Sequence, residues 1–131
     1  MSDMRLNFIL MCDQAFQDPA SGKGSIIGIF DTIGAKAVPT VHPRFFVVVN
    51  TSGNKGSYAG TIEIINKKND EVIASARGMI EMNPKGANTL VVNFVNVVFP
   101  AFGSYWLKFT IDGNILTTPE SHYIRVEENE K

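Results

Sequence analysis

Apolar and polar residues alternate along much of this chain with the two-residue period of β-strands. The clearest stretch is 105–111, where every second residue is large and apolar. Its inward positions are Tyr105, Leu107, Phe109 and Ile111, and its outward positions are Trp106, Lys108 and Thr110. Asp112-Gly113-Asn114 follows, and these residue types tolerate the positive φ of a tight turn. We therefore expect a closing hairpin, with 123–126 as the returning strand.

The same pattern recurs between short turns and predicts about eight strands and no helix. The expected strands are 5–13, 25–33, 44–50, 58–66, 72–82, 89–99, 105–111 and 123–126. Short strands at this spacing are typical of an all-β, antiparallel, Greek-key-like β-sandwich. Residues 1–126 are predicted to form one domain, with 127–131 as a polar C-terminal tail. Pro39 and Pro43 predict an irregular crossover over 34–43, because proline is excluded from central strands.

Several predicted strands are apolar on both faces, whereas each sheet of a two-layer sandwich has one face toward water. The residues of 44–50 expected to point into the core are Phe45, Val47 and Val49. Phe46 and Val48 then lie on the opposite face. Together with outward-facing Trp106, they are predicted to form an apolar surface that a second copy covers. The alternative is that the connection around Val38 and Val41 folds over this face within one chain.

Composition excludes some classes of function. Hydrophobic residues make up 44% of the 131 residues, which excludes disorder as a description of the whole chain. Lysine and arginine total 12 against 13 acidic residues, a net charge of −1, so no nucleic-acid partner is expected. No apolar run approaches the roughly 20 residues of a membrane span, and no export signal is recognised. The predicted location is the cytoplasm, with no membrane partner.

Cys12 is the single cysteine, so an intrachain disulfide is excluded. It shares the two-residue period of Leu6, Phe8 and Leu10, which predicts that all four residues point inward. Cys12 is therefore interpreted as a small buried hydrophobic residue rather than a reactive thiol.

No catalytic motif, metal site or cofactor site is recognised, so the chain is not predicted to be an enzyme. Two sets of polar residues stay open as candidates. His42 and His122 would need the fold to bring them together before they could bind a metal. Asp13, Asp18 and Asp31 would form a carboxylate cluster only if their strand ends meet, and backbone hydrogen bonding at turns is the favoured interpretation.

Exposed aromatic residues provide a second kind of candidate site. Trp106 is predicted to share an outward face with polar residues, an arrangement that can stack against a sugar ring. Tyr58 and Tyr123 are the other aromatic residues considered as ligand contacts.

Four short segments carry a resemblance to a known family. They are L-M-C-D at 10–13, G-K-G-S-I-I-G-I-F-D at 22–31, V-H-P-R-F at 41–45, and Pro100 with Gly103-Ser104-Tyr105. The chain resembles a family of small, single-domain bacterial proteins whose only label is a domain of unknown function. The resemblance implies a compact β-sandwich and brings no activity, cofactor or catalytic residue.

Two functions of different classes follow. The leading hypothesis is a non-enzymatic interaction module that forms a homo-oligomer or binds a protein partner through an apolar sheet face. The alternative is a small-ligand or carbohydrate-binding β-sandwich that uses an exposed aromatic residue.

Overall fold

The computed structural model describes residues 4–21 and 23–129, and in this part of the chain ten strands and no helix are present. No segment of these residues is a helix long and apolar enough to cross a membrane. The strands are β1 (Arg5–Gln17), β2 (Gly24–Phe30), β3 (Thr32–Ala35), β4 (Thr40–Ser52), β5 (Gly56–Asn66), β6 (Val72–Met82), β7 (Ala87–Phe99), β8 (Gly103–Ile111), β9 (Asn114–Ile115) and β10 (Tyr123–Glu128).

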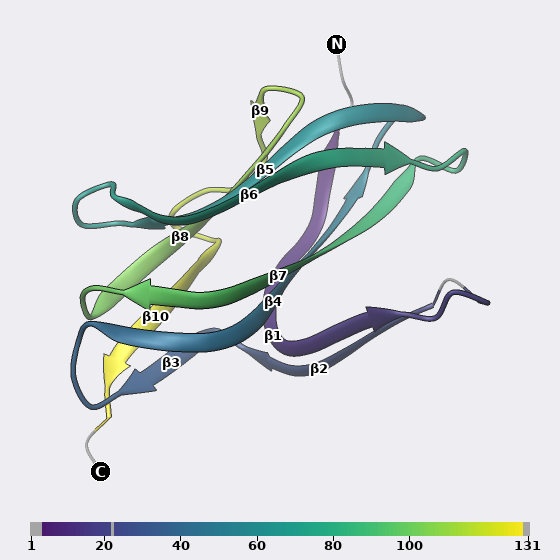
Figure 1. Cartoon of the computed structure of the whole chain (residues 1–131). Helices are drawn as coiled ribbons and strands as arrows, with labels where there is room; N and C mark the ends of the chain where they lie inside the picture. The colour runs from purple at the N-terminus through teal and green to yellow at the C-terminus, as the bar shows by residue number, and fades with distance from the viewer. Residues whose placement is uncertain (1–3, 22, 130–131) are drawn as a thin grey trace.

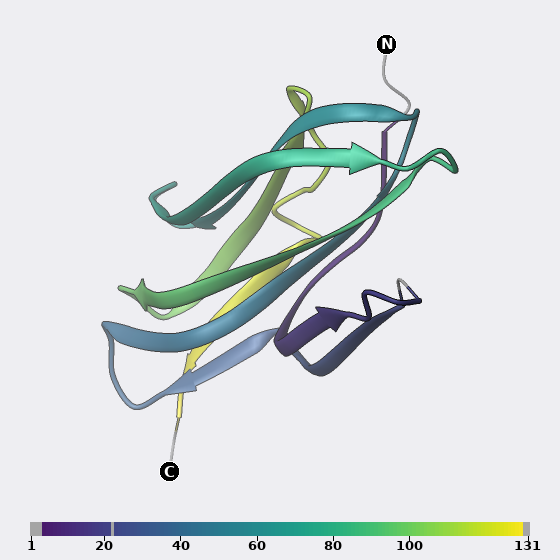
Figure 2. The same cartoon turned by 45° about the vertical axis from the view of Figure 1, so that its right-hand side comes forward.

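The described strands form two sheets that pack face to face, as Figures 1 and 2 show from two directions. Sheet A has the order β2-β1-β4-β7, and sheet B has the order β3-β10-β8-β5-β6, with β9 beside β8. All strand pairs are antiparallel except β3 with β10. The chain crosses between the sheets five times, for example from β4 to β5 and from β6 to β7. The predicted all-β antiparallel sandwich is therefore confirmed.

The main core lies between the sheets and contains the residues that the two-residue period turned inward. All four predicted inward residues of β8 are buried, with Tyr105 and Phe109 fully enclosed. From β4, Phe45 stacks on Phe94 of β7 at a centroid distance of 5.3 Å. Phe99 meets the Tyr105 ring edge-on at 5.2 Å. The Phe45–Phe94 stack lies within sheet A, and the Phe99–Tyr105 contact joins sheet A to sheet B.

The predicted irregular crossover over 34–43 is wrong in its second half, because β4 already begins at Thr40 and contains Pro43. β1 pairs with β4 only as far as the Cys12–Phe46 pair. The first residues of β4 therefore pair with β7 alone, and Pro43 loses no hydrogen bond to β1. Asn96, which faces Pro43 across the β4–β7 pair, has a φ of 54°.

Three further differences concern strand ends. The predicted strand 25–33 is divided at Asp31, so that β2 belongs to sheet A and β3 to sheet B. β9 is a short additional strand that pairs with β8 besides β5 and β10. β10 continues to Glu128, so Glu127 and Glu128 of the predicted tail belong to a strand, while residues 130 and 131 lie outside the described part.

β1 changes face near its start, which corrects one predicted set of inward residues. Its pairing register with β4 shifts between Leu6 and Phe8. Leu6 packs against the main core, but Phe8 is 38% exposed. The extra residue, Asn7, donates hydrogen bonds to Asn50 Oδ1 at 2.8 Å and Ser52 Oγ at 2.7 Å. A bulge of this kind reverses the alternation of every later residue in the strand.

Beyond this bulge, β1 and β2 form a hairpin that we call the hairpin arm, residues 13–28. The arm starts where Asp13 and Gly28 face each other, and Gly28 has a φ of 72°. A Cβ at Gly28 would collide with the side chain of Asp13. The tip of the arm projects from the two sheets (Figure 1, right), while Ala15 and Ile26 pack on the outer side of sheet A.

A second, smaller core forms under the hairpin arm. Its buried members are Cys12, Ala15 and Val48, and the half-buried Leu10, Ile26, Phe46 and Val91 pack against it. Cys12 is therefore buried as predicted, although it lies in this second core and not between the two sheets.

Candidate functional site

The predicted interface of Phe46, Val48 and Trp106 does not exist as one surface. Phe46 and Val48 lie on the outer side of sheet A, whereas Trp106 lies on the outer side of sheet B. Val48 is 1% exposed, because the hairpin arm covers it, and Phe46 is half-buried in the same cluster. A segment of the same chain thus covers this face, as the alternative hypothesis required. The covering segment is the arm and not the connection around Val38.

Exposed apolar side chains remain on sheet A beyond the reach of the arm. We call Val41 of β4 with Val95 and Val98 of β7 the valine patch. Their exposed fractions are 53%, 57% and 46%, and Val41 lies directly opposite Val98 in the β4–β7 pair. Soluble proteins seldom leave neighbouring large apolar residues uncovered on a strand pair.

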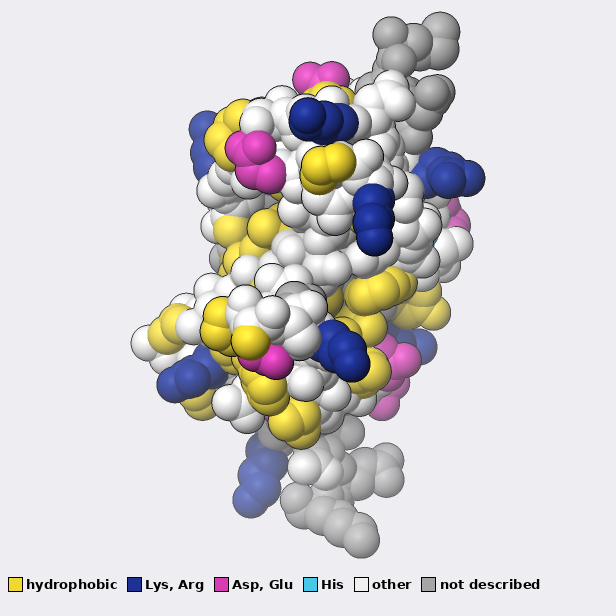
Figure 3. Space-filling model, turned by 90° about the vertical axis from the view of Figure 1, so that its right-hand side faces the viewer, with side chains coloured by type: hydrophobic (Ala, Val, Ile, Leu, Met, Phe, Trp, Pro, Cys, Tyr) yellow, Lys and Arg dark blue, Asp and Glu magenta, His cyan; other side chains and the backbone are white. Residues whose placement is uncertain are grey.

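A second group of exposed apolar residues lies on the hairpin arm and the part of β2 that follows it. Phe16 is 50% exposed, Ile27 53% and Ile29 64%. Figure 3, which views the molecule from the side where the arm projects, shows apolar side chains gathered over its lower half. This group and the valine patch both belong to sheet A.

Among the described strands, β7 is an edge strand with unusual composition. Its 13 residues, A-N-T-L-V-V-N-F-V-N-V-V-F, include no charged residue, glycine or proline. The other edges are each less suited to pairing: β3 has 4 residues, β2 bends at Gly28, and β6 carries Arg77 and Glu81. Natural sheets protect their edges with charges, bends or short strands. β7 has no charged residue that could protect its edge.

Between the edges of β6 and β7 the sandwich is not fully closed. We call this opening the β6–β7 seam. It contains a cavity of about 410 Å³ lined from Ile73 to Ala76 and from Asn93 to Val98. A second cavity, of about 250 Å³, continues it along Leu90–Asn93 toward Gly78. Five apolar residues of β6 and β7 that pack on the main core stay only half-buried: Ile73, Ala74, Ala76, Leu90 and Val92.

Two of the three predicted ligand-contact residues are brought together on sheet B. Tyr123 of β10 lies directly opposite Trp106 of β8. Lys67 Nζ lies 4.7 Å from the centroid of the Tyr123 ring, and Lys108 Nζ lies 5.5 Å from that of Trp106. Trp106 Nε1 is buried and has no hydrogen-bond partner among the described residues. Trp106 and Tyr123 thus form a pair of neighbouring rings with a lysine over each.

Tyr58, the third predicted contact, belongs elsewhere. Its ring packs against the main core, and its hydroxyl donates a hydrogen bond to the backbone oxygen of Asn54 at 3.0 Å. Tyr58 therefore has a structural role at the start of β5.

The three aspartates do not converge. Asp18 lies at the tip of the hairpin arm, where Ala20 N–H (3.0 Å) and the Ser21 hydroxyl (2.8 Å) donate to its carboxylate and lower its pKa. Asp13 lies at the base of the arm, and Asp31 accepts a bond from the Thr32 hydroxyl at 3.1 Å. Within 4–21 and 23–129, no three His, Cys, Asp or Glu residues are grouped to hold a metal. At Asp18 this is the favoured interpretation, backbone hydrogen bonding at a turn, and for Asp13 and Asp31 that interpretation stays a prediction.

The two histidines line different cavities. His42 lies between the rings of Phe30 and Phe45, with centroid distances of 5.7 and 5.5 Å, near Asp13. His122 accepts a hydrogen bond at Nδ1 from Thr118 N–H at 2.9 Å, beside β10. Neither is arranged as a ligand for a shared metal.

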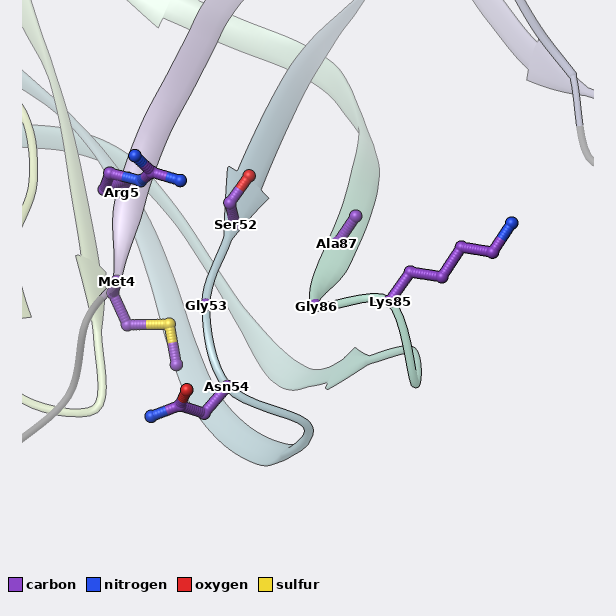
Figure 4. Close-up of a pocket in the computed structure, with 8 residues that line it drawn as sticks. All are labelled: Met4, Arg5, Ser52, Gly53, Asn54, Lys85, Gly86 and Ala87. Carbon is purple, nitrogen blue, oxygen red and sulfur yellow. The ribbon is translucent and has the colours of Figure 1, made fainter.

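A cavity of about 620 Å³ lies where the start of β1 meets the turns after β4 and before β7, and it was not anticipated from the sequence (Figure 4). Arg5 points across it toward Ser52, while the side chain of Lys85 extends away. Its floor is a contact between two turns, in which Gly53 N–H donates to Gly86 O at 2.9 Å. The cavity is open, and its two cationic residues do not converge on one point.

Comparison with known proteins supplies a family. The model of a family of unknown function, DUF6941, matches residues 7–120, which is most of the chain. The chain belongs to DUF6941. No curated protein matches it. The resemblance to a family of unknown function is therefore confirmed, and the bacterial origin that it implied stays a prediction.

Among solved structures, this DUF6941 chain is similar to the CARDB domain of the PF1109 protein from Pyrococcus furiosus, determined in complex with di-metal ions. The identity is 12% and the TM-score 0.40, over 95% of this chain and 92% of the other.

The burial of Cys12 leads to a prediction for this DUF6941 protein. The thiol is fully buried, and burial raises its pKa, so little reactive thiolate forms. We expect a thiol reagent to label the native protein slowly and the urea-unfolded protein fast, as followed by mass spectrometry. Rapid stoichiometric labelling of the native protein would reopen a redox or nucleophilic role.

His42 leads to a prediction about pH. Burial lowers the pKa of His42, and the nearby Asp13 carboxylate opposes this shift. His42 therefore binds a proton more readily in the unfolded chain than in the folded protein. The folded protein is favoured while His42 is neutral, above about pH 6.5, and its free energy of unfolding decreases as the pH falls below this value. We expect a lower urea midpoint at about pH 5.5 than at about pH 7.5, and a smaller difference in His42→Phe. His122→Gln is the control. If the pH dependence of the urea midpoint decreased equally in His42→Phe and His122→Gln, its assignment to His42 would be wrong.

Proposed function

We propose that this DUF6941 protein is a non-enzymatic interaction module that self-associates through the exposed apolar side of sheet A, along β7. The observation that supports it is the valine patch, three half-exposed residues on β4 and on the uncharged edge strand β7. Phe46 and Val48 no longer contribute, because the hairpin arm covers them. The proposal therefore moves the predicted contact from the centre of sheet A to its β7 side.

The size of the patch indicates how strong the contact is. About half of each valine side chain is already buried, so covering the rest contributes on the order of 1 kcal/mol per residue. Six valines across a two-fold axis then contribute on the order of 6 kcal/mol, before the costs of association. Side-chain burial alone thus gives a weak contact, and a stable dimer needs additional interactions from β7.

Light scattering coupled to size-exclusion chromatography tests the proposal. We expect a concentration-dependent dimer between about 1 μM and about 1 mM. Val95→Lys, which places a charge in the valine patch, should weaken the dimer by about tenfold or more. Val72→Lys is the matched control, because Val72 is similarly exposed (46%) but lies on sheet B. A wild-type protein that is monomeric at every concentration would refute self-association.

A second candidate function, binding of a small ligand or carbohydrate, is favoured by the adjacent rings of Trp106 and Tyr123. Trp106 is the single tryptophan, so its fluorescence reports directly on this surface. Titration with a panel of mono- and oligosaccharides should shift the emission if a sugar stacks there, and Tyr123→Ala should weaken the response. Tyr58→Phe is the control. A flat response across the panel would remove carbohydrates from consideration.

A further inference from the structure

We propose that two copies of this chain pair edge to edge through β7, antiparallel across a two-fold axis, and close their β6–β7 seams against each other. This inference rests on the proposed self-association and specifies the β7 edge as its main contact. Of the valine patch, Val95 lies within the paired part of β7, whereas Val98 and Val41 lie beyond it. The partner is a second copy of the same chain.

The first argument is the backbone of β7. In an antiparallel strand, alternate residues direct their N–H and C=O groups to opposite sides. β4 pairs with β7 from Ala87 to Phe99 on one side. On the other side, no strand pairs with β7 within the described residues. Another strand is the partner that satisfies such a row of groups along its whole length.

The second argument is the composition and length of the edge. Asn96 has a φ of 54°, and at the other end the N–H and C=O of Ala87 are bonded to Asn83. The regular unpaired part of the edge therefore runs from residue 88 to residue 95, and these eight residues span about 27 Å. The absence of charge means that a second β7 can approach without like-charge repulsion and without burying a charge.

The third argument is the β6–β7 seam, which an added strand would cover. A strand paired with β7 extends sheet A past the edge of β6, so its inward side chains lie over the two cavities. The residues that line the cavities include the small apolar Ala74 and Ala76 together with polar Ser75 and Asn93. A second β7 brings Leu90 and Val92 to this position, and both are half-buried in the isolated chain. Leu90 and Val92 of each copy would thus cover the β6–β7 seam of the other copy.

The fourth argument concerns closure and size. Pairing β7 with β7 is isologous and leaves no unpaired β7 edge, so it stops at two copies. Pairing β2 with β7 would be head-to-tail and would continue indefinitely, and the bend at Gly28 disfavours it. A contact about 27 Å long and two layers, roughly 20 Å, deep covers about 500 Å² per copy, which is the size of a weak, concentration-dependent interface.

A pair of matched variants on β6 tests the inference. Ala76→Arg places a charged side chain at a position that lines both cavities of the seam, whereas Met79→Arg places the same charge on an exposed position of the same strand that lines neither cavity. We expect Ala76→Arg to weaken the dimer by about tenfold or more and Met79→Arg to leave it nearly unchanged. Equal dimerisation by both variants, or a loss confined to Met79→Arg, would overturn the inference.

Hydrogen exchange of the wild-type protein provides a test that needs no variant. Amides on the outer edge of β7 should exchange fast at concentrations where the chain is monomeric and be protected where it is dimeric. Amides of β2, a different edge of sheet A, should exchange at the same rate in both conditions. A dimer whose β7 exchange does not change with concentration refutes edge pairing but leaves the proposed self-association intact. A wholly monomeric protein refutes both, and open-ended polymers refute the two-fold geometry.

Discussion

Phe109→Ala is expected to lower the free energy of unfolding by about 3–5 kcal/mol, measured by urea denaturation. Phe109 is fully buried in β8, directly opposite Ile62 of β5. Truncation removes its apolar contacts and leaves a cavity that the close-packed core fills only in part. Leu107 and Ile111 flank it on the same inward face, so little space is available for relaxation.

Lys108→Ala, one residue away, is the matched control and should change stability by at most about 0.5 kcal/mol. Lys108 faces outward, and its side chain reaches Glu63 at 3.8 Å, a long and partly solvated ion pair. If Lys108→Ala proved more destabilising than Phe109→Ala, the strand register of β8 would be wrong by one residue.

Val48→Asp has the second large expected effect, a loss of at least about 3 kcal/mol. Val48 is 1% exposed under the hairpin arm, so the new carboxylate would be buried beside Cys12 and Ala15 without a partner. The charge reaches water only if the arm separates from sheet A. We therefore expect Cys12 to become reactive toward thiol reagents in this variant, in parallel with the drop in stability.

Val95→Asp is the comparison for Val48→Asp, because Val95 is 57% exposed on the same side of sheet A. Its effect on the stability of the monomer should stay within about 0.5 kcal/mol. Equal stability of the two variants, with Cys12 still protected, would mean that the arm does not cover Val48 in solution.

Much of the fold could be predicted because the two-residue period records which side chains are buried. In β8 and in the central part of β4 every predicted inward residue belongs to the main core, including Phe45 and Phe109. The two-residue period no longer predicts which side chains are buried where the strand departs from regular pairing with its neighbour. The bulge at Asn7 shifts the later residues of β1 by one position, and nothing in the local composition marks it.

The candidate sites were harder to predict, because they depend on which strands become neighbours. Phe46 and Val48 were correctly placed on the face opposite the core, but their cover comes from residues 13–28, through a bend that requires Gly28. The pairing of Trp106 with Tyr123 follows from the β8–β10 register, whereas Tyr58 turns into the core. The edge position of β7 depends on the order of strands in sheet A, which side-chain periodicity does not encode.

The order of strands in sheet A also affects how the chain folds. The central strand β4 pairs with β1 and β7, and these pairs join residues about 35–60 positions apart, as in Cys12–Phe46 and Thr40–Phe99. The β5–β6 hairpin is local by comparison and closes a turn of a few residues. Pairs of strands distant in sequence form late, because closing a long loop costs entropy before the pairing contributes any stability. The β5–β6 hairpin should therefore form before β4 pairs with β7. The uncharged β7 segment is then still unpaired on both edges, and refolding yield should fall as protein concentration rises.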